Sequence, residues 1–443
     1  MTARSVCMNA LLCVDENEGY SNIVIDKELR KAGLEPRDSA LASTIFYGVL
    51  EREITLDHYI RQFLNNPRQK LEAGVAVLLR MAVYQILYLD RIPDSAAVNE
   101  AVALAKETGR GKYAGFINGV LRNFLRGKDN LTMPSAEKDF YLYCSVQYSI
   151  PQALVKLWDE SYGREKLLSL LEALSSRAAL YVRVNTLKIT ADELLKRLKD
   201  EGCEAEFCAF VENAIRIDRL PGKITDLLSF EEGLFHVQDT ASQLLCSFVA
   251  PAPETVTADV CAAPGGKSFT MAQYMNGTGR LLSFDLYKGR VRLIRDGAQR
   301  LSIPNIETGV RDAATATDDF MADTVLCDVP CSGFGVIRRK PEIRRKDPAQ
   351  AKELPALQYT ILCNAAAHVQ PGGRLVYSTC TLHPAENGEV AERFLREHPE
   401  FMPEPIDFPH SIEEPEHMLT MLPGALDTDG FFAARFRRKK ENV

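Results

Sequence analysis

The sequence predicts a multidomain protein with an all-α N-terminal domain, a small α+β subdomain and a C-terminal α/β domain of the Rossmann-like, doubly wound type. Three patterns predict this order. Apolar residues recur at helical spacing over residues 1–130, helical and strand-like segments mix over 143–235, and strand–loop–helix repeats fill 236–443. A chain of 443 residues is long enough for two or three domains.

The N-terminal domain, residues 1–130, is predicted to be all-α. Its apolar residues recur at steps of three and four without strand-like alternation, so the helices should pack their apolar stripes on one another. One such stripe consists of Val75, Leu78, Leu79, Ala82 and Ile86. The polar, proline-containing stretch GKDNLTMPSAEKD that follows indicates a linker.

The small subdomain, residues 143–235, mixes two kinds of segment. PQALVKLWDESYG and ADELLKRLKDEG are typical of helices, whereas ALYVRVN and AIRID are typical of short strands. This mixture predicts an α+β fold.

The C-terminal domain, residues 236–443, is predicted to hold the chemistry. Five short apolar segments alternate with longer, helix-compatible ones, which is typical of a doubly wound sheet with ligands at the carboxyl ends of its strands. The five segments are VTADVCA, GRLLSFDL, NIETGVRD, DTVLCDVP and GRLVYSTC.

Composition excludes several classes. The chain is 46% hydrophobic and 26% charged, without a run of ~18 apolar residues, so a membrane span is not expected. The N-terminus does not match a signal peptide, and we expect a cytoplasmic protein. Eleven cysteines lie scattered in apolar runs, as buried thiols do. We expect no metal site, because the close pairs Cys203–Cys208 and Cys327–Cys331 lack the second half of a zinc site.

The net charge of −7 argues against a uniformly basic nucleic-acid binder, but the basic residues are clustered. They gather in GRGKYAGFINGVLRNFLRGK, in RRKPEIRRK and in RFRRKK near the C-terminus. Each run alone is commonly a solvated surface, whereas three on an acidic chain favour a local nucleic-acid site.

The stretch CAAPGGKS follows the first predicted strand of the C-terminal domain. It is no Walker A loop, since Cys261 stands where that motif needs glycine, and no G-x-G-x-x-G fingerprint is present. What remains is a glycine turn at Gly265 and Gly266, with Asp285 and Asp312 ending the next two strands. This arrangement suits an adenosine ligand without a phosphate chain, of which S-adenosylmethionine is the commonest. The alternative is that both acids merely cap helices.

Asp328, Cys331 and Cys380 follow the fourth and fifth strands, so they should meet at the same sheet edge. A single cysteine is more often an inert buried thiol, but two beside a carboxylate favour chemistry. A thiolate can attack carbon 6 of a pyrimidine, which makes carbon 5 nucleophilic enough to take a methyl group. A protonated carboxyl at the ring nitrogen would stabilise the charge that develops.

These segments resemble the RNA cytosine-5 methyltransferases of the Sun/Fmu/NSUN group. DVCAAPGGKS, DVPCSGFGVIRRKPEIR and YSTCTLHPAENGEV are similar to three of its signature motifs, and FHVQDTASQLLC and LPGALDTDGFFAARF to flanking segments. VNEAVALAKETGRGKYAGFINGVLRNFLR resembles the NusB RNA-binding fold. The resemblance covers nearly the whole chain, and it implies a cytosine in small-subunit (16S) ribosomal RNA as the target.

The resemblance also implies residue roles. Cys380 corresponds to the nucleophile, and Cys331 to the cysteine needed to remove the carbon 5 proton and release the product. Asp328 should contact the cytosine, with Lys267 holding it or the surroundings of the nucleophile. In ENGEV, Gly388 separates Asn387 from Glu389, whereas many relatives have an uninterrupted Glu-Asn-Glu. This difference affects how the following helix begins. The residues matching the S-adenosylmethionine site are Cys261, Ala262, Ala263, Pro264, Gly265, Gly266, Lys267, Asp285, Asp312 and Asp328.

RNA contacts are expected from two basic stretches. Arg338, Arg339 and Arg344 follow Cys331 closely and can meet phosphates beside an unstacked cytosine. The helical domain should add Arg110, Lys112, Arg122 and Arg126, unless it is a purely structural bundle. Two other functions remain open, namely methylation of transfer RNA or another RNA, and a non-enzymatic NusB-like RNA-binding or antitermination factor. We expect a monomer, since no exposed apolar stripe argues for self-association.

Overall fold

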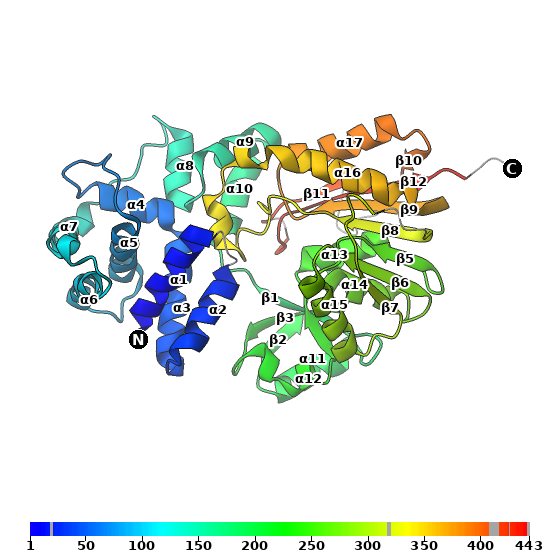
Figure 1. Cartoon of the computed structure of the whole chain (residues 1–443), viewed down its shortest axis with the longest axis horizontal. Coiled ribbons are helices and arrows are strands. Elements are labelled where there is room, and N and C mark those ends of the chain that lie inside the picture. The colour runs from blue at the N-terminus through cyan, green and yellow to red at the C-terminus, as the bar shows by residue number, and fades with distance from the viewer. Residues whose placement is uncertain (18–20, 317–319, 407–415, 425, 441–443) are drawn as a thin grey trace. The chain divides into compact units, whose positions relative to one another are not determined.

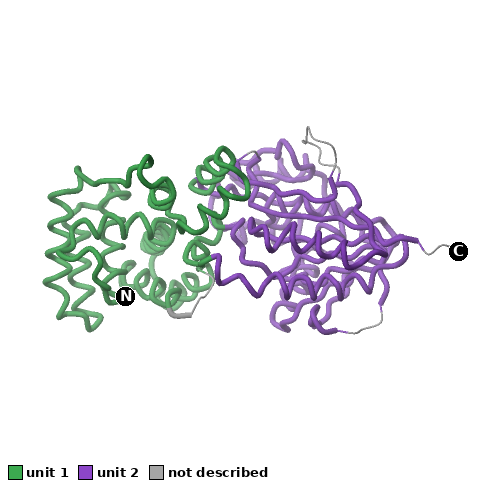
Figure 2. The backbone as a smooth tube through the Cα atoms, turned by 90° about the horizontal axis from the view of Figure 1, so that it is seen from above, with its two compact units in different colours: residues 1–175, 337–347 green, residues 176–336, 348–443 purple. Residues whose placement is uncertain are grey.

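The computed structural model describes residues 1–17, 21–316, 320–406, 416–424 and 426–440. The chain folds into two compact units, drawn in green and purple in Figure 2. The helical unit comprises Met1–Ser175 and Ile337–Asp347, and the sheet unit comprises Ser176–Val336 and Pro348–Val443. A short segment from late in the sequence thus folds with the N-terminal part of the chain.

The helical unit packs its helices around one apolar core (Figure 1). The predicted stripe lies on α5, where Val75, Leu78, Leu79 and Ala82 are buried, and the Glu72 carboxylate caps the helix by accepting from the Val75 amide at 3.0 Å. The α-helices are α1 (Ala3–Asn17), α2 (Ser21–Ala32), α3 (Pro36–Glu51), α4 (Glu53–Arg61), α5 (Ala73–Tyr88), α6 (Asp94–Glu107), α7 (Ala114–Gly127), α8 (Phe140–Tyr148), α9 (Gln152–Tyr162) and α10 (Arg164–Ser175).

Helices α8, α9 and α10 belong to the helical unit, whereas the sequence pattern places most of this region in the α+β subdomain. Polar contacts link the end of α8 to α4 in this unit. The Thr55 hydroxyl donates to the Val146 carbonyl at 2.5 Å, and the Ser149 hydroxyl accepts from the Ile54 amide at 3.0 Å. These contacts join residues that are more than 90 positions apart in sequence, which helical periodicity cannot reveal.

The small sheet begins the sheet unit and is antiparallel, in the order β2-β3-β1-β4. The predicted segments ALYVRVN and AIRID form its central strands, and ADELLKRLKDEG forms α11, which Thr190 and Glu193 cap reciprocally. The elements are β1 (Leu180–Val184), α11 (Ala191–Asp200), β2 (Glu204–Phe207), β3 (Ala214–Arg219), α12 (Leu228–Glu231) and β4 (Phe235–Val237).

The large sheet has the order β10-β12-β9-β8-β5-β6-β7, with β11 paired to β12. The five predicted strands form its parallel part, β7-β6-β5-β8-β9, and β12 runs antiparallel to β9. Its strands are β5 (Val256–Asp259), β6 (Arg280–Asp285), β7 (Ile306–Val310), β8 (Ala322–Asp328), β9 (Val369–Thr379), β10 (Phe401–Pro403), β11 (Met418–Met421) and β12 (Phe431–Arg438).

Helices cover both faces of the large sheet (Figure 1). One face packs against α13 (Thr240–Val249), α14 (Gly266–Tyr274) and α15 (Lys288–Leu301), and the other against α16 (Leu354–Ala367) and α17 (Gly388–Glu397). This is the doubly wound architecture that the strand–helix alternation predicts. Among the residues described above, no helix is long and apolar enough to cross a membrane.

Candidate active site

The loop after β5 makes a tight turn into α14. Gly265 has φ +111°, in the left-handed region, and a Cβ atom there would lie 2.4 Å from the Phe269 ring. The Gly265 amide donates to the Ala262 carbonyl at 2.8 Å, which closes the turn. Glycine at position 265 is therefore required both by backbone geometry and by space.

Asp285 and Asp312 lie at the ends of neighbouring parallel strands, as predicted. The Asp285 carboxylate is 4% exposed, accepts from the Ala263 amide at 3.3 Å and pairs with Arg290 at 3.3 Å. Asp312 follows β7 and accepts from the Ala314 amide at 2.9 Å. Both acids thus have structural contacts, as expected if they only cap helices. Asp285, however, also accepts from the glycine loop.

This edge fits S-adenosylmethionine by the chemistry of its donors and acceptors. Carboxylates on adjacent strand ends can accept from the hydroxyls of a ribose, and the turn at Gly265 and Gly266 lets backbone amides approach a ligand closely. A Cβ at Gly266 would lie in ordinary van der Waals contact with the Gln238 side chain, at 3.8 Å.

Lys267 and Asp328 form a largely buried ion pair. The Lys267 Nζ lies 2.7 Å from the Asp328 Oδ2, and the Ser378 hydroxyl donates to Oδ1 at 2.9 Å. Burial alone would lower the pKa of Lys267, but the Asp328 carboxylate outweighs it and raises that pKa. Both Asp328 oxygens therefore accept hydrogen bonds within the protein.

Cys331 and Cys380 meet beside this ion pair. Parallel pairing of β8 with β9 sets Asp328 opposite Ser378, so the loops after the two strands leave the sheet together. The two Sγ atoms lie 3.3 Å apart. The hydrogen bond to Cys380 and burial raise the pKa of the Cys331 thiol well above its usual value. The juxtaposition that the sequence predicts is therefore present.

Two buried residues beside the site were not among the predicted ones. Asp259 ends β5 at 1% exposure and accepts from the Ser268 hydroxyl at 2.7 Å. Burial raises the pKa of Asp259 to about 7. Glu386 is fully buried and bonded to Ser332, next to Cys331. The position of Asp259 at a strand end was a usable signal, whereas Glu386 resembles an ordinary acid at a helix start.

Arg344 was expected to face RNA phosphates, but the structure buries it. Its guanidinium is buried in the helical unit and donates to the carbonyls of Tyr148 (2.7 Å), Ser149 (3.2 Å) and Leu174 (2.9 Å). Its donors therefore hold residues 337–347 in that unit instead of facing phosphates. Arg338 and Arg339, at the start of the same segment, are partly exposed.

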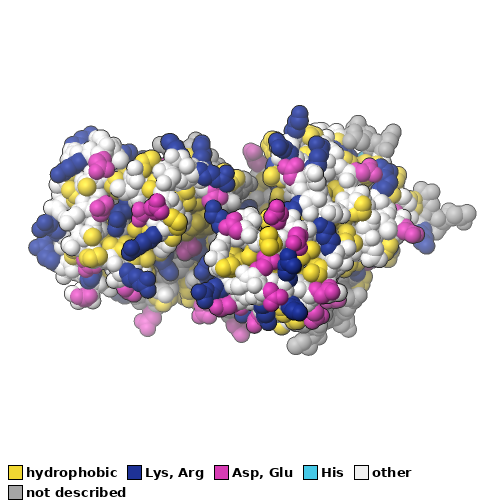
Figure 3. All heavy atoms as spheres, turned by 90° about the horizontal axis from the view of Figure 1, so that it is seen from below, with side chains coloured by type: hydrophobic (Ala, Val, Ile, Leu, Met, Phe, Trp, Pro, Cys, Tyr) yellow, Lys and Arg dark blue, Asp and Glu magenta, His cyan; other side chains and the backbone are white. Residues whose placement is uncertain are grey.

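The predicted basic residues of the helical domain are mostly at its surface. Lys112, Arg122 and Arg126 are exposed, and the two arginines bond Asn118 and Asn123 on the same helix, α7. Arg110 instead pairs with the Glu72 carboxylate at 3.1 Å. On the face shown in Figure 3, Lys and Arg side chains of the helical unit alternate with Asp and Glu.

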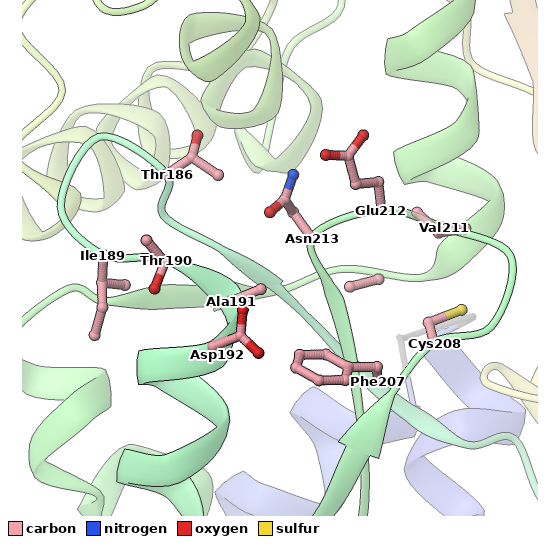
Figure 4. Close-up of a pocket in the computed structure, with 11 residues that line it drawn as sticks. Thr186, Ile189, Thr190, Ala191, Asp192, Phe207, Cys208, Val211, Glu212 and Asn213 are labelled. Carbon is pink, nitrogen blue, oxygen red and sulfur yellow. The ribbon is translucent and has the colours of Figure 1, made fainter.

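The sheet unit has a surface hollow of about 490 Å³ near β3 and the start of α11 (Figure 4). Thr190, Phe207 and Asn213 are among its lining residues, and none of the predicted catalytic or cofactor residues is. Over the described parts of the chain, no group of three or more His, Cys, Asp or Glu side chains is arranged to hold a metal ion.

Comparison with known proteins assigns the family. The model of "16S rRNA methyltransferase RsmB/F" matches residues 246–437, that of the NusB family 1–126, and that of a "Methyltr_RsmF/B-like, ferredoxin-like domain" 150–222. The probable ribosomal RNA small subunit methyltransferase B of Bacillus subtilis (strain 168) is 36% identical over 99% of both chains. The chain belongs to the ribosomal RNA small subunit methyltransferase B (RsmB) family.

Other comparisons agree with the RsmB assignment. A probable ribosomal RNA small subunit methyltransferase B of Synechocystis is 33% identical, over 99% of this chain and 100% of that protein. The crystal structure of PH0851 aligns with a TM-score of 0.83 at 25% identity over 99% of each chain. The resemblance and the fold class inferred from sequence are thereby confirmed: a NusB domain, a ferredoxin-like domain and a Rossmann-like methyltransferase domain.

Proposed function

We propose that this RsmB-family chain transfers a methyl group from S-adenosylmethionine to carbon 5 of a cytosine in small-subunit ribosomal RNA. The observation that carries the proposal is the 3.3 Å contact between the Cys331 and Cys380 thiols beside the Lys267–Asp328 ion pair. The names of the full-length relatives support ribosomal RNA as the substrate.

Cys380 is the nucleophile in this proposal. The hydrogen bond between the two sulfurs raises the Cys331 pKa, so we assign Cys331 as the protonated partner of this contact. Lys267 favours a negative charge on Cys380, because the interaction between these two groups is among the causes that raise the Lys267 pKa. One donor and one cation thus both stabilise the Cys380 thiolate.

The reaction begins when the Cys380 thiolate forms a bond to carbon 6, and the electrons of the carbon 5–carbon 6 double bond move toward carbon 5. In this step Lys267 would stabilise the negative charge that develops on the ring, and Asp328 would contact the cytosine. S-adenosylmethionine supplies the electrophilic methyl group for carbon 5. Residues 261–267, Asp285 and Asp312 would hold that cofactor at the strand ends.

Release of the product falls to Cys331. Once Cys380 is bonded to carbon 6, it no longer accepts the Cys331 hydrogen bond, so the largest cause of the raised Cys331 pKa is gone. Cys331, after losing its own proton to solvent, removes the proton from carbon 5. The double bond re-forms and the sulfur–carbon 6 bond breaks, which returns Cys380 as a thiolate.

Two other functions predict different products. A transfer RNA methyltransferase would use the same thiols on another RNA, and an RNA-binding factor without enzymatic activity would require neither thiol. The relatives' names favour small-subunit RNA over transfer RNA, and the paired thiols favour an enzyme.

Labelled methyl transfer tests the proposal. The full-length protein is incubated with methyl-labelled S-adenosylmethionine and either unmethylated small-subunit RNA or bulk transfer RNA, and the RNA is digested to nucleosides. We expect label in 5-methylcytidine from the small-subunit RNA alone, and none with Cys380→Ala. Label in transfer RNA, in another nucleoside, or in no nucleoside would contradict the proposal.

A further inference from the structure

Glu386 and Asn387 contact the two loops that carry the thiols. Glu386 lies in a short 3-10 turn that follows the Cys380 loop. Asn387 comes next, and α17 begins at Gly388. Both side chains are almost fully buried, at 0% and 3% exposure. Neither is assigned a role by the proposed chemistry, and buried polar groups of this kind need complete hydrogen bonding.

The Glu386 carboxylate holds the Cys331 loop. Its Oε1 accepts from the Ser332 hydroxyl at 2.5 Å, and its Oε2 accepts from the Ser332 amide at 2.9 Å and from Gln358 Nε2 at 2.8 Å. Gln358 Nε2 also donates to the Pro330 carbonyl at 2.9 Å. The residues on both sides of Cys331 are therefore bound to a single buried carboxylate–amide pair.

The Asn387 amide group holds the Cys380 loop in the same manner. Its Oδ1 accepts from the Thr379 hydroxyl at 2.6 Å, and its Nδ2 donates to the Thr381 carbonyl at 3.0 Å. Thr379 and Thr381 flank Cys380. One more contact joins the two loops, because the hydroxyls of Ser332 and Thr381 lie 2.7 Å apart.

We propose that Glu386 and Asn387 are positioning residues for different steps of the reaction. Glu386 aligns Cys331 for product release, and Asn387 aligns Cys380 for attack. This inference rests on the proposed function, since it assigns the loops to separate steps. It follows from the pattern of contacts. Asn387 binds both neighbours of Cys380, and Glu386 binds Ser332 directly and Pro330 through Gln358. Misplacing a reacting group by about 1 Å can cost on the order of 10²-fold in rate.

Glu386→Gln and Asn387→Ala should therefore fail at different steps. Gln places a donor where Glu386 has an acceptor, so it opposes one of the donors from Ser332 or Gln358 and loosens the Cys331 loop. We expect methyl transfer in the first turnover within about threefold of wild type, steady-state turnover ~10²-fold lower, and a protein–RNA adduct that accumulates. Asn387→Ala should instead slow the first turnover ~10²-fold without an accumulating adduct.

The experiment combines single-turnover methyl transfer, steady-state turnover and adduct detection on a denaturing gel, with small-subunit RNA and S-adenosylmethionine. Glu389→Gln, an exposed position in the first turn of α17, is the matched control and should behave as wild type. Ser332→Ala removes only the hydroxyl between the loops. It replaces Glu386→Gln if the Glu386→Gln protein melts far below wild type. We then expect a smaller accumulation of adduct.

The outcomes separate the two claims. If wild type forms 5-methylcytidine and Cys331→Ala traps an adduct, but Glu386→Gln turns over like wild type or slows the first turnover without trapping, the positioning inference is overturned. An equal adduct in Asn387→Ala would overturn it too. If wild type transfers no methyl group to cytosine, the proposed function itself fails.

Discussion

The Sγ atoms of Cys331 and Cys380 lie 3.3 Å apart although 49 residues separate them in the sequence. The parallel pairing of β8 with β9 produces this contact, because Asp328 faces Ser378 in the register and each cysteine follows within three residues. Lys267 reaches the same place from the start of α14. Two neighbouring strands and the start of one helix thus bring two thiols, an ammonium and a carboxylate together at one edge of the sheet.

The Lys267–Asp328 ion pair should be required for both stability and activity. Lys267→Met leaves the Asp328 carboxylate without its cation in a site that is only 20% exposed, and we expect a loss of stability of about 1–3 kcal/mol. Activity should fall at least ~10²-fold, since charge stabilisation in the reaction is lost. Thermal melting and methyl transfer measure the two effects. In the double variant Lys267→Met/Asp328→Asn the stability should recover while activity stays low; recovery of both would contradict a catalytic role.

Asp259 should make stability depend on pH. Its pKa is about 7 in the folded protein because of burial, against an ordinary 3.8, so between these values the folded state binds more protons than the unfolded state. Stability from this group is therefore lost as pH rises from about 4 to about 7.

Asp259→Asn removes this dependence. Its stability relative to wild type should rise by roughly 2–4 kcal/mol between pH 4.5 and pH 7.5. Urea unfolding followed by circular dichroism at the two pH values measures the difference in free energy of unfolding between the variant and wild type. The contributions of other buried groups such as His236 cancel in this difference. A relative stability that is independent of pH would show that Asp259 is ionised throughout.

Arg344 should stabilise the helical unit. Removing a buried guanidinium that donates to three carbonyls leaves those carbonyls unsatisfied, so Arg344→Ala should cost on the order of 3 kcal/mol. Arg344→Lys should not restore the stability, because an ammonium cannot reproduce the planar arrangement of donors. Thermal melting tests this, with the exposed neighbour Lys346→Ala as control. Equal melting temperatures for Arg344→Ala and the control would contradict it.

Arg122 and Arg126 on α7 should contribute to RNA affinity by charge. Both are exposed and four residues apart, so they lie on one helix face. Changing both to Glu should weaken RNA binding by about tenfold near 0.1 M salt and reduce the salt dependence of binding. Lys166→Glu, exposed on α10, controls for net charge. An equal loss in that control would contradict a role for α7.

Point substitutions are preferable to removal of the N-terminal domain for this purpose. Residues 337–347 pack in the helical unit through Arg344, and the same segment begins six residues after Cys331. A deletion would therefore disturb the chain next to the thiols and confound RNA recognition with catalysis.

Much of this site could be predicted from sequence because parallel strands deliver their loops to one edge. A recognisable strand or glycine turn marks the position of each of four residues, namely Cys331, Cys380, Asp328 and Lys267. Their proximity can therefore be predicted without knowing how the side chains pack. Arg344 could not be placed, since a basic run looks the same whether its arginines face solvent or bind carbonyls. Glu386 was missed because only the folded loops show which groups its carboxylate satisfies.

The most direct test of the account is adduct trapping by the two cysteine variants. Cys331→Ala and Cys380→Ala are each incubated with unmethylated small-subunit RNA and S-adenosylmethionine and run on a denaturing gel. The account predicts a slowly released protein–RNA adduct with Cys331→Ala and none with Cys380→Ala. An adduct with Cys380→Ala alone would mean that the roles of the thiols are exchanged, and an adduct with neither would contradict covalent catalysis.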